Sequence, residues 1–355
     1  MRASIRVGYL ASALLLAACG SKNEAGSDGG SAPYPVPPRG GQAQGETNLA
    51  RLLTEEPEGK PRTPLWSGYW FPYQSGGTSS ALTQYEKASG NAGAVSWERA
   101  HHGPEGAAGW WGHCNGWSAA SALFDEPRSP RTVGGVVLSV ADQKALLTEI
   151  AMEVTADFFG NRSDVAGDIS SSRFEDVLPN QFLLVLTNYI GRAGLPVIMD
   201  RYAGNQVWNH PIAGYRLAPL HPADSLGTGP GGLFRLNMTA QVWWVRDDVE
   251  PGHLTEAFSF QDGPSYESRV YHFEVWLDHP PVFDGSGKLT SSGNVVVTKD
   301  ADGFVKGGVW TNTDLSPVDS HPDYLWVPKQ VAPSTGNSNP NLDPAWVLRN
   351  IAGQS

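Results

Sequence analysis

The chain has 355 residues, a formal net charge of -11 and 10% aromatic residues, including 13 Trp. An excess of acidic over basic residues does not favour a basic groove, so the composition argues against nucleic acid or anionic lipid headgroups as partners. The chain shows no internal repeat, and its length allows one substantial domain behind an N-terminal extension.

The N-terminus has the layout of a secretory leader. Arg2 and Arg6 precede an apolar run that is too short to span a bilayer, and the run ends in Leu16-Ala17-Ala18-Cys19. This ending resembles the lipobox of bacterial lipoproteins, in which the cysteine is acylated and becomes the new N-terminus. We therefore predict a signal peptide over 1–18 and a lipid anchor on Cys19. Because no Asp follows Cys19, the resemblance implies the outer membrane of the cell envelope.

Composition divides the rest of the chain. Residues 19–60 are rich in Gly, Ser and Pro and predict a flexible tether. A folded domain is predicted over 61–330 and a C-terminal tail over 331–355. If Cys19 carries the lipid, no second cysteine remains to pair with Cys114, although export places the protein where disulfides form. Either Cys114 is reactive or it packs as a small hydrophobic residue.

Hydrophobic periodicity predicts helices in the first half and strands in the second. Helices are expected over 117–124, about 141–159 and 179–190, followed by a strand over 195–199. Alternating β-branched and aromatic residues then predict a mainly antiparallel sheet from strands over 212–217, 234–245, 268–277, 295–298 and 305–310. Helices first and strands afterwards indicate the α+β class.

Cys114 stands where a glycine-containing loop meets the helix expected after it. A helix N-terminus carries partial positive charge and free N–H groups, which lower a thiol pKa and can bind an oxyanion. This layout is typical of papain-like thiol enzymes, in which the base and its orienting group come from later strands. Cys114 is therefore the candidate nucleophile.

Several segments resemble the elicitor-type transglutaminases, secreted cysteine enzymes of oomycetes and bacteria. The resemblance covers most of residues 64–328 and is carried by GWWGHCNGWSAAS (109–121), DQKALLTEI (142–150), VLTNYIGRAGLPVIMDR (185–201), QVWNHPIAGY (206–215), YHFEVWLD (271–278), GGVW (307–310) and HPDYLW (321–326). It implies a papain-related fold and a Cys-His-Asp-type triad with Cys114 as nucleophile. It also implies a protein glutamine as acyl donor and a lysine amine as acceptor. Where many relatives have the base histidine, this chain has Leu183.

The histidine that acts as base is open. His210 heads the strand-like run His-Pro-Ile-Ala-Gly-Tyr and is the preferred candidate. His113 is expected to position the loop, while His101 and His102 could fold back toward the thiol. His272 alternates with apolar residues in a strand, and the sequence leaves open to which face it points. His321 is expected at a corner, where its ring caps backbone groups.

The orienting carboxylate is equally open. Asp200 ends a buried strand ten residues before His210, and it is the preferred assignment. Asp247 and Asp248 close an aromatic strand and are the alternatives.

No Cys/His spacing predicts a metal site and no glycine-rich loop predicts a nucleotide cofactor, so we expect neither. The sequence predicts acyl transfer through a thioester on Cys114. A papain-type peptidase or amidase needs the same residues, and a non-catalytic binding module that keeps the fold is the other alternative, favoured by Leu183.

Overall fold

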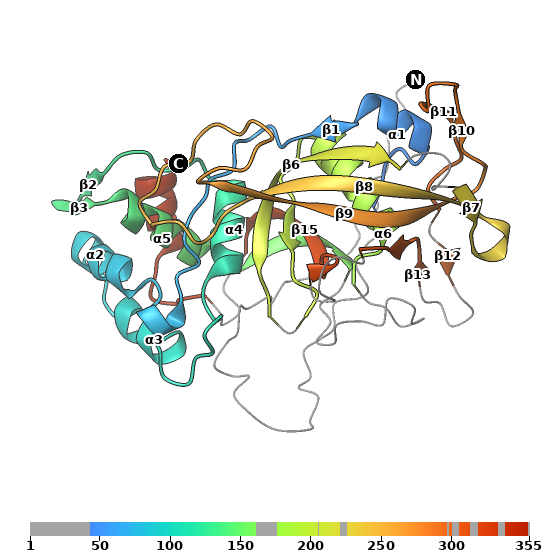
Figure 1. Cartoon of the computed structure of the whole chain (residues 1–355). Coiled ribbons are helices and arrows are strands. Elements are labelled where there is room, and N and C mark those ends of the chain that lie inside the picture. The colour runs from blue at the N-terminus through green and yellow to red at the C-terminus, as the bar shows by residue number, and fades with distance from the viewer. Residues whose placement is uncertain are drawn as a thin grey trace, which may run out of the picture.

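A computed structural model shows how the chain folds (Figure 1). It describes residues 43–160, 176–204, 206–220, 226–296, 298–299, 305–312, 319–332 and 338–353. Cys19 and the predicted signal peptide lie outside the described residues.

Helices gather at one end of the molecule and strands at the other (Figure 1). The helical end contains α2 (Ser79–Ser89), α3 (Ala94–His101), α4 (Cys114–Leu123), α5 (Val140–Ile150), α8 (Pro344–Val347), the short π-helix η6 (Leu348–Ala352) and the hairpin β2–β3 (Arg131–Val133 and Val136–Leu138). On the far side of the sheet lie α6 (Pro179–Val185) and the π-helix η3 (Leu186–Arg192). The α+β class is thus confirmed.

The main sheet is antiparallel throughout, as expected. Its strand order is β14-β9-β8-β6-β5-β15-β4, and β1 and β7 add to the edges of β6 and β8. These strands are β1 (Glu58–Gly59), β4 (Val154–Gly160), β5 (Ile198–Asp200), β6 (Asn209–Pro219), β7 (Leu226–Thr228), β8 (Phe234–Val245), β9 (Tyr266–Leu277), β14 (Val309–Trp310) and β15 (Tyr324–Val331). Short two-stranded ribbons pair β10 (Val282–Phe283) with β11 (Leu289–Ser291) and β12 (Thr298–Lys299) with β13 (Val305–Lys306).

The sheet buries apolar side chains on both faces. Strand side chains alternate between faces, so Trp243 joins the core against α4 and α5, whereas its neighbour Trp244 joins the core against α6. The two cores position α4 firmly, because every residue from Cys114 to Ala122 is buried. At Gly116 a Cβ would lie 2.6 Å from the Thr148 carbonyl oxygen, so glycine is required for α4 to approach α5 this closely.

One predicted helix is too long. Residues 141–159 were expected to form a single helix, but α5 ends at Ile150 and Val154–Gly160 form β4. The apolar residues Val154 and Phe158 are four positions apart, which fits one face of a helix and also one face of a strand. The strand prevails because β15 pairs with this segment along its whole length.

The ordered chain extends beyond the predicted domain on both sides. Within the stretch predicted as tether, α1 (Leu49–Glu55) buries Leu49 and Leu52 in the core and β1 pairs with β6. Within the predicted tail, Val347 and Ile351 of α8 and η6 are buried in the core beside α5. The packed structure therefore begins before residue 61 and continues past residue 330.

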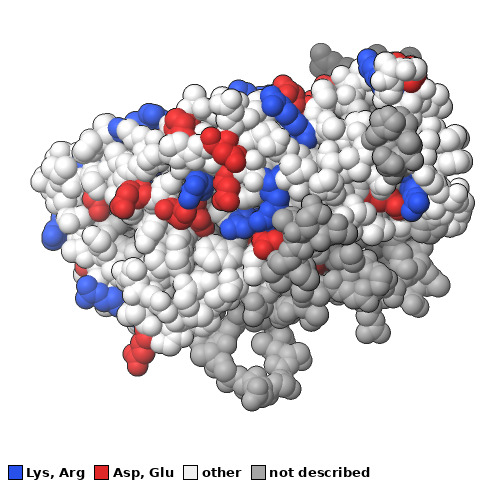
Figure 2. All heavy atoms as spheres, in the orientation of Figure 1, with Lys and Arg blue, Asp and Glu red and all other residues white. Residues whose placement is uncertain are grey.

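In the part of the chain that the structure describes, no helix has the length and apolar character needed to cross a bilayer. Acidic and basic side chains are interspersed over the face shown in Figure 2.

Candidate functional site

Cys114 is the first residue of α4, as the sequence predicts. The preceding backbone is fixed by a bond of 2.6 Å from the His113 N–H to the Trp70 carbonyl. Gly112 permits this contact, because a Cβ there would lie 2.5 Å from the Trp70 ring. The thiol side chain is 2% exposed, so substrate must displace neighbouring side chains to reach it. Trp70 and Trp110 pack against the cluster that Cys114 forms with Val207.

Two groups at the start of β6 and just before it contact the Cys114 sulfur. The carbonyl oxygen of Val207 lies 3.5 Å from Sγ, and the side-chain amide nitrogen of Asn209 lies 4.0 Å from it. The Trp326 indole N–H donates a bond of 2.9 Å to the other end of the Asn209 amide, which fixes its NH2 group toward the sulfur. Sequence reasoning missed Asn209, although it stands beside His210 in a segment that carried the family resemblance.

The Cys114 sulfur is part of a disulfide in this structure. The chain contains one other cysteine, Cys19, which lies outside the described residues. The sequence predicts an unpaired thiol at Cys114, and the disulfide in the structure differs from this prediction. A cysteine in a disulfide is not a nucleophile, and the site can react only in the reduced form.

Asp200 ends β5 and holds the loop that leads to β6. One of its carboxylate oxygens accepts the Trp208 N–H at 2.8 Å and the Tyr202 N–H at 3.4 Å. This loop carries Val207 to the Cys114 sulfur. Asp200 therefore influences the nucleophile through the backbone of the loop.

His210 lies beside α4, with its ring centroid 6.2 Å from that of Trp117, one turn after Cys114. Within the described residues, its ring nitrogens contact Val245, Arg201 and Asp247. Nδ1 lies 3.1 Å from the Val245 carbonyl, Nε2 receives a bond of 3.2 Å from Arg201 Nε, and Asp247 lies 3.8 Å away. Burial and the Arg201 charge lower the pKa of His210 to about 3, so the ring is neutral at neutral pH.

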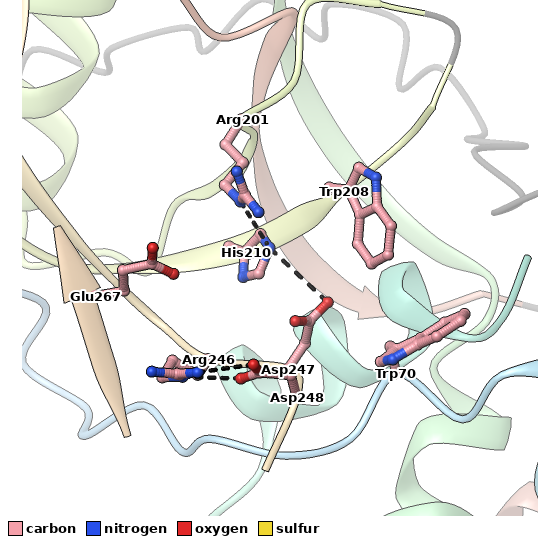
Figure 3. Close-up of a pocket in the computed structure, with 8 residues that line it drawn as sticks. All are labelled: Trp70, Arg201, Trp208, His210, Arg246, Asp247, Asp248 and Glu267. Atoms are coloured by element: carbon pink, nitrogen blue, oxygen red, sulfur yellow. Dashed lines mark hydrogen bonds and ion pairs between the residues drawn. The ribbon is translucent and has the colours of Figure 1, made fainter. Parts of the chain in front are cut away.

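His210 also lines a cavity of about 230 Å³ (Figure 3). Trp70, which packs against the cluster of Cys114 and Val207, lies in the cavity wall with its ring 5.5 Å from that of Trp208. The remaining lining residues are charged: Arg201, Arg246, Asp247, Asp248 and Glu267. Burial raises the pKa of Asp247 to about 7, whereas the hydrogen bonds from Arg246 lower the pKa of Asp248.

His113 points into the helical end of the molecule, which fits the expectation that it positions the loop. Its Nε2 lies 3.1 Å from a Glu149 oxygen and 3.4 Å from a Glu98 oxygen. Burial would lower the pKa of His113, but these two carboxylates outweigh it and raise the pKa to about 10. His102 is bonded to Glu98 at 2.8 Å, and His101 stacks on Trp97, so neither approaches the thiol.

His321 and Leu183 lie away from the thiol. His321 is paired with Asp176 at 2.8 Å and stacks on Trp310, so these partners are side chains and not the backbone groups that the sequence predicts. Leu183 stands where many relatives have a histidine. It lies on α6 and is fully buried in the core between α6 and the sheet. That core cluster is separate from the cluster of Cys114 and Val207.

Comparisons with known proteins agree with this arrangement. Residues 77–225, which include α4, Asp200 and His210, match the family model of the transglutaminase elicitor. The crystal structure of the GP42 transglutaminase from Phytophthora sojae is similar, with a TM-score of 0.58 at 18% identity, over 86% of this chain and 92% of that chain. A comparison with curated protein sequences gives no match. The resemblance expected from the sequence is confirmed: residues 77–225 match the transglutaminase elicitor family, and the fold is similar to that of a transglutaminase.

Proposed function

We propose that the protein transfers the acyl group of a protein glutamine to an amine through a thioester on Cys114. The observation that carries the proposal is the position of this sulfur, at the first residue of a buried helix with the Asn209 amide beside it. The partial positive charge of the helix N-terminus stabilises the thiolate. Its free N–H groups can donate hydrogen bonds to an oxyanion that forms beside the sulfur.

The chemistry follows from these groups. The thiolate attacks the carboxamide carbon and forms a C–S bond, while the carbonyl oxygen becomes an oxyanion stabilised by N–H donors. The oxyanion then re-forms the carbonyl, the C–N bond breaks, and the nitrogen takes a proton from the protonated base and leaves as ammonia. The incoming amine attacks the thioester carbon and gives a proton to the base, and the C–S bond breaks to release the thiolate.

We propose that His210 is the base. Asp200 holds the loop that joins β5 to β6, and His210 follows this loop. Neutral imidazole is the form that accepts a proton, and His210 is neutral at neutral pH. Its Nε2 lone pair faces Arg201, however, so proton transfer requires the Arg201 side chain to move. The low pKa also weakens this imidazole as a base, so substrate binding must relieve its burial or its contact with Arg201.

The proposal includes an envelope lipoprotein anchored through Cys19. The support is the Leu16-Ala17-Ala18-Cys19 ending of the leader. A lipid thioether on Cys19 uses the sulfur that a disulfide would need, so lipidation excludes a Cys19–Cys114 bond. The reduced Cys114 that catalysis requires is consistent with that mature form.

The test is incorporation of a biotinylated primary amine into a glutamine-containing protein, with and without a thiol reductant. We expect incorporation and ammonia release that require the reductant in a chain with an unmodified Cys19 and do not require it in the lipidated form. Cys114→Ser should abolish both. Ser118→Ala, one turn further along α4, is the matched control and is expected to stay active. Peptide fragments without amine incorporation would indicate the peptidase alternative. Failure of the reduced wild type with all amines would indicate the non-catalytic module.

A further inference from the structure

A buried cluster of four side chains lies directly behind the nucleophile, on the side away from the sheet. It consists of Glu98 and His102 of α3, His113 before α4, and Glu149 of α5, and we call it the His-Glu cluster. All four side chains are at least 95% buried. The proposed acyl transfer uses none of them.

The donor atoms of the His-Glu cluster have the spacing of a metal coordination sphere. A nitrogen or carboxylate oxygen from each of Glu98, His102 and His113 lies within 4.8 Å of the others. His113 Nε2 is 3.1 Å from Glu149 and 3.4 Å from Glu98. A tetrahedral zinc site with bonds of about 2.0–2.1 Å places neighbouring ligand atoms about 3.3–3.4 Å apart.

Two polar atoms in or beside the cluster have no hydrogen-bond partner among the described residues. They are Glu149 Oε2 and the hydroxyl of Tyr73, whose ring stacks on His102 at 4.7 Å. A buried polar atom without a partner costs folding free energy, so such atoms need a ligand or an ion. Two of them at one buried group point to something that binds there.

Charge supports a dication rather than an anion or a neutral ligand. In the described part of the chain, the ion pairs of Glu98 and Glu149 are all to histidine. A bound dication would displace the proton that His113 holds, and two carboxylates with two neutral imidazoles would then balance its charge. This ligand set suits a first-row transition metal. Gly77 leaves room at the site, because a Cβ there would lie 2.4 Å from Glu98 Oε1.

We propose that the His-Glu cluster binds a divalent transition-metal ion, such as zinc, which fixes the start of α4. Glu98, His102, His113 and Glu149 supply the ligand atoms. The bound ion would join α3, α5 and the loop ahead of Cys114, so its role is to position the nucleophile. No ligand touches the reacting atoms, and metal binding is therefore measurable whether or not the protein transfers acyl groups.

The experiment is metal titration of the full mature chain after chelator treatment. We expect the wild type to bind about one zinc ion per chain by calorimetry and elemental analysis, with a higher melting temperature. Cobalt should give the visible absorption of a four-coordinate site. Glu98→Gln and Glu149→Gln should each weaken zinc binding at least about 10-fold.

Asp176→Asn is the matched control, because it alters another buried carboxylate–histidine pair, with His321. It should bind zinc as the wild type does. If the wild type binds no zinc, or if both Gln variants fold and bind it unchanged, the cluster is a metal-free ion-pair network and the proposal is wrong. Equal loss in Asp176→Asn would indicate an indirect effect of folding and would also overturn it. If a Gln variant does not fold, the wild-type stoichiometry and cobalt spectrum decide.

Discussion

Replacing Asp247 by Asn should change the pH dependence of folding stability. Asp247 is 6% exposed in the cavity that His210 also lines, and one of its oxygens has no hydrogen-bond partner among the described residues. Burial raises its pKa from 3.8 to about 7, the Arg201 charge opposes this, and the charge of Asp248 adds to it. The folded protein thus holds a proton that the unfolded chain has already lost.

The sign and size of the effect follow from this difference. A folded pKa above the unfolded value means that stability falls as pH rises from about 4 through 7. Over that range a gap of about three pKa units removes up to ~4 kcal/mol. Because the unfolded carboxyl is largely ionised by pH 5, the part lost between pH 5 and pH 8 is about 2–3 kcal/mol. Asn cannot ionise, so Asp247→Asn should gain this amount relative to the wild type as pH rises.

Urea unfolding of both proteins at pH 5, 6, 7 and 8 measures the difference. Asp284→Asn is the control. Hydrogen bonds from Ser286 and Lys288 lower the pKa of Asp284, so that carboxylate stays ionised over this range and the effect of its loss should not vary with pH. A stability difference between Asp247→Asn and the wild type that is constant from pH 5 to pH 8 would refute the reasoning. If the change is seen, a carboxyl that titrates near neutral pH lies next to the proposed base.

Three other predictions concern separate parts of the chain. His210→Ala should lose at least ~100-fold in amine incorporation with an unchanged melting temperature, whereas His253→Ala, a half-buried loop residue, should keep its activity; an active His210→Ala would discard this base. Cys19→Ala should lose both the lipid mass and membrane association, and equal membrane retention would contradict the anchor. Gly68→Ala should lower stability by about 1–3 kcal/mol in urea unfolding, because its Cβ would lie 2.1 Å from the Trp117 indole nitrogen; an unchanged midpoint would show that the indole moves freely.

Local signals in the sequence were sufficient for much of the fold. The glycine-containing loop before Cys114 and the alanine-rich run after it predicted the start of α4, and alternation predicted β8 and β9 almost residue for residue. These patterns are set by neighbours in the chain. The helix prediction failed from Val154 onward because the apolar spacing there fits a helix and a strand equally well. Only the pairing with β15 decides for the strand.

The partners of the site residues were not predictable in the same way. His210 fits the sequence pattern of a base, but its nitrogen contacts come from Arg201 and from Val245 of β8, which only the folded sheet brings together. Asn209 is its neighbour in the chain, and only the approach of α4 shows that its amide lies beside the sulfur. Residue type indicated the chemistry here, and tertiary contacts assigned it to particular atoms.

The position of Cys114 depends on two separate supports, and this is why the neighbouring residues matter for function. On the sheet side, Asp200 holds the loop that brings Val207 to the sulfur. On the helical side, His113 is held by the buried carboxylates of Glu98 and Glu149. A change in the first support displaces the groups that face the substrate, whereas a change in the second displaces the start of the helix itself. Variants of Asp200 should therefore alter activity with little effect on metal binding, and variants of the His-Glu cluster should alter both.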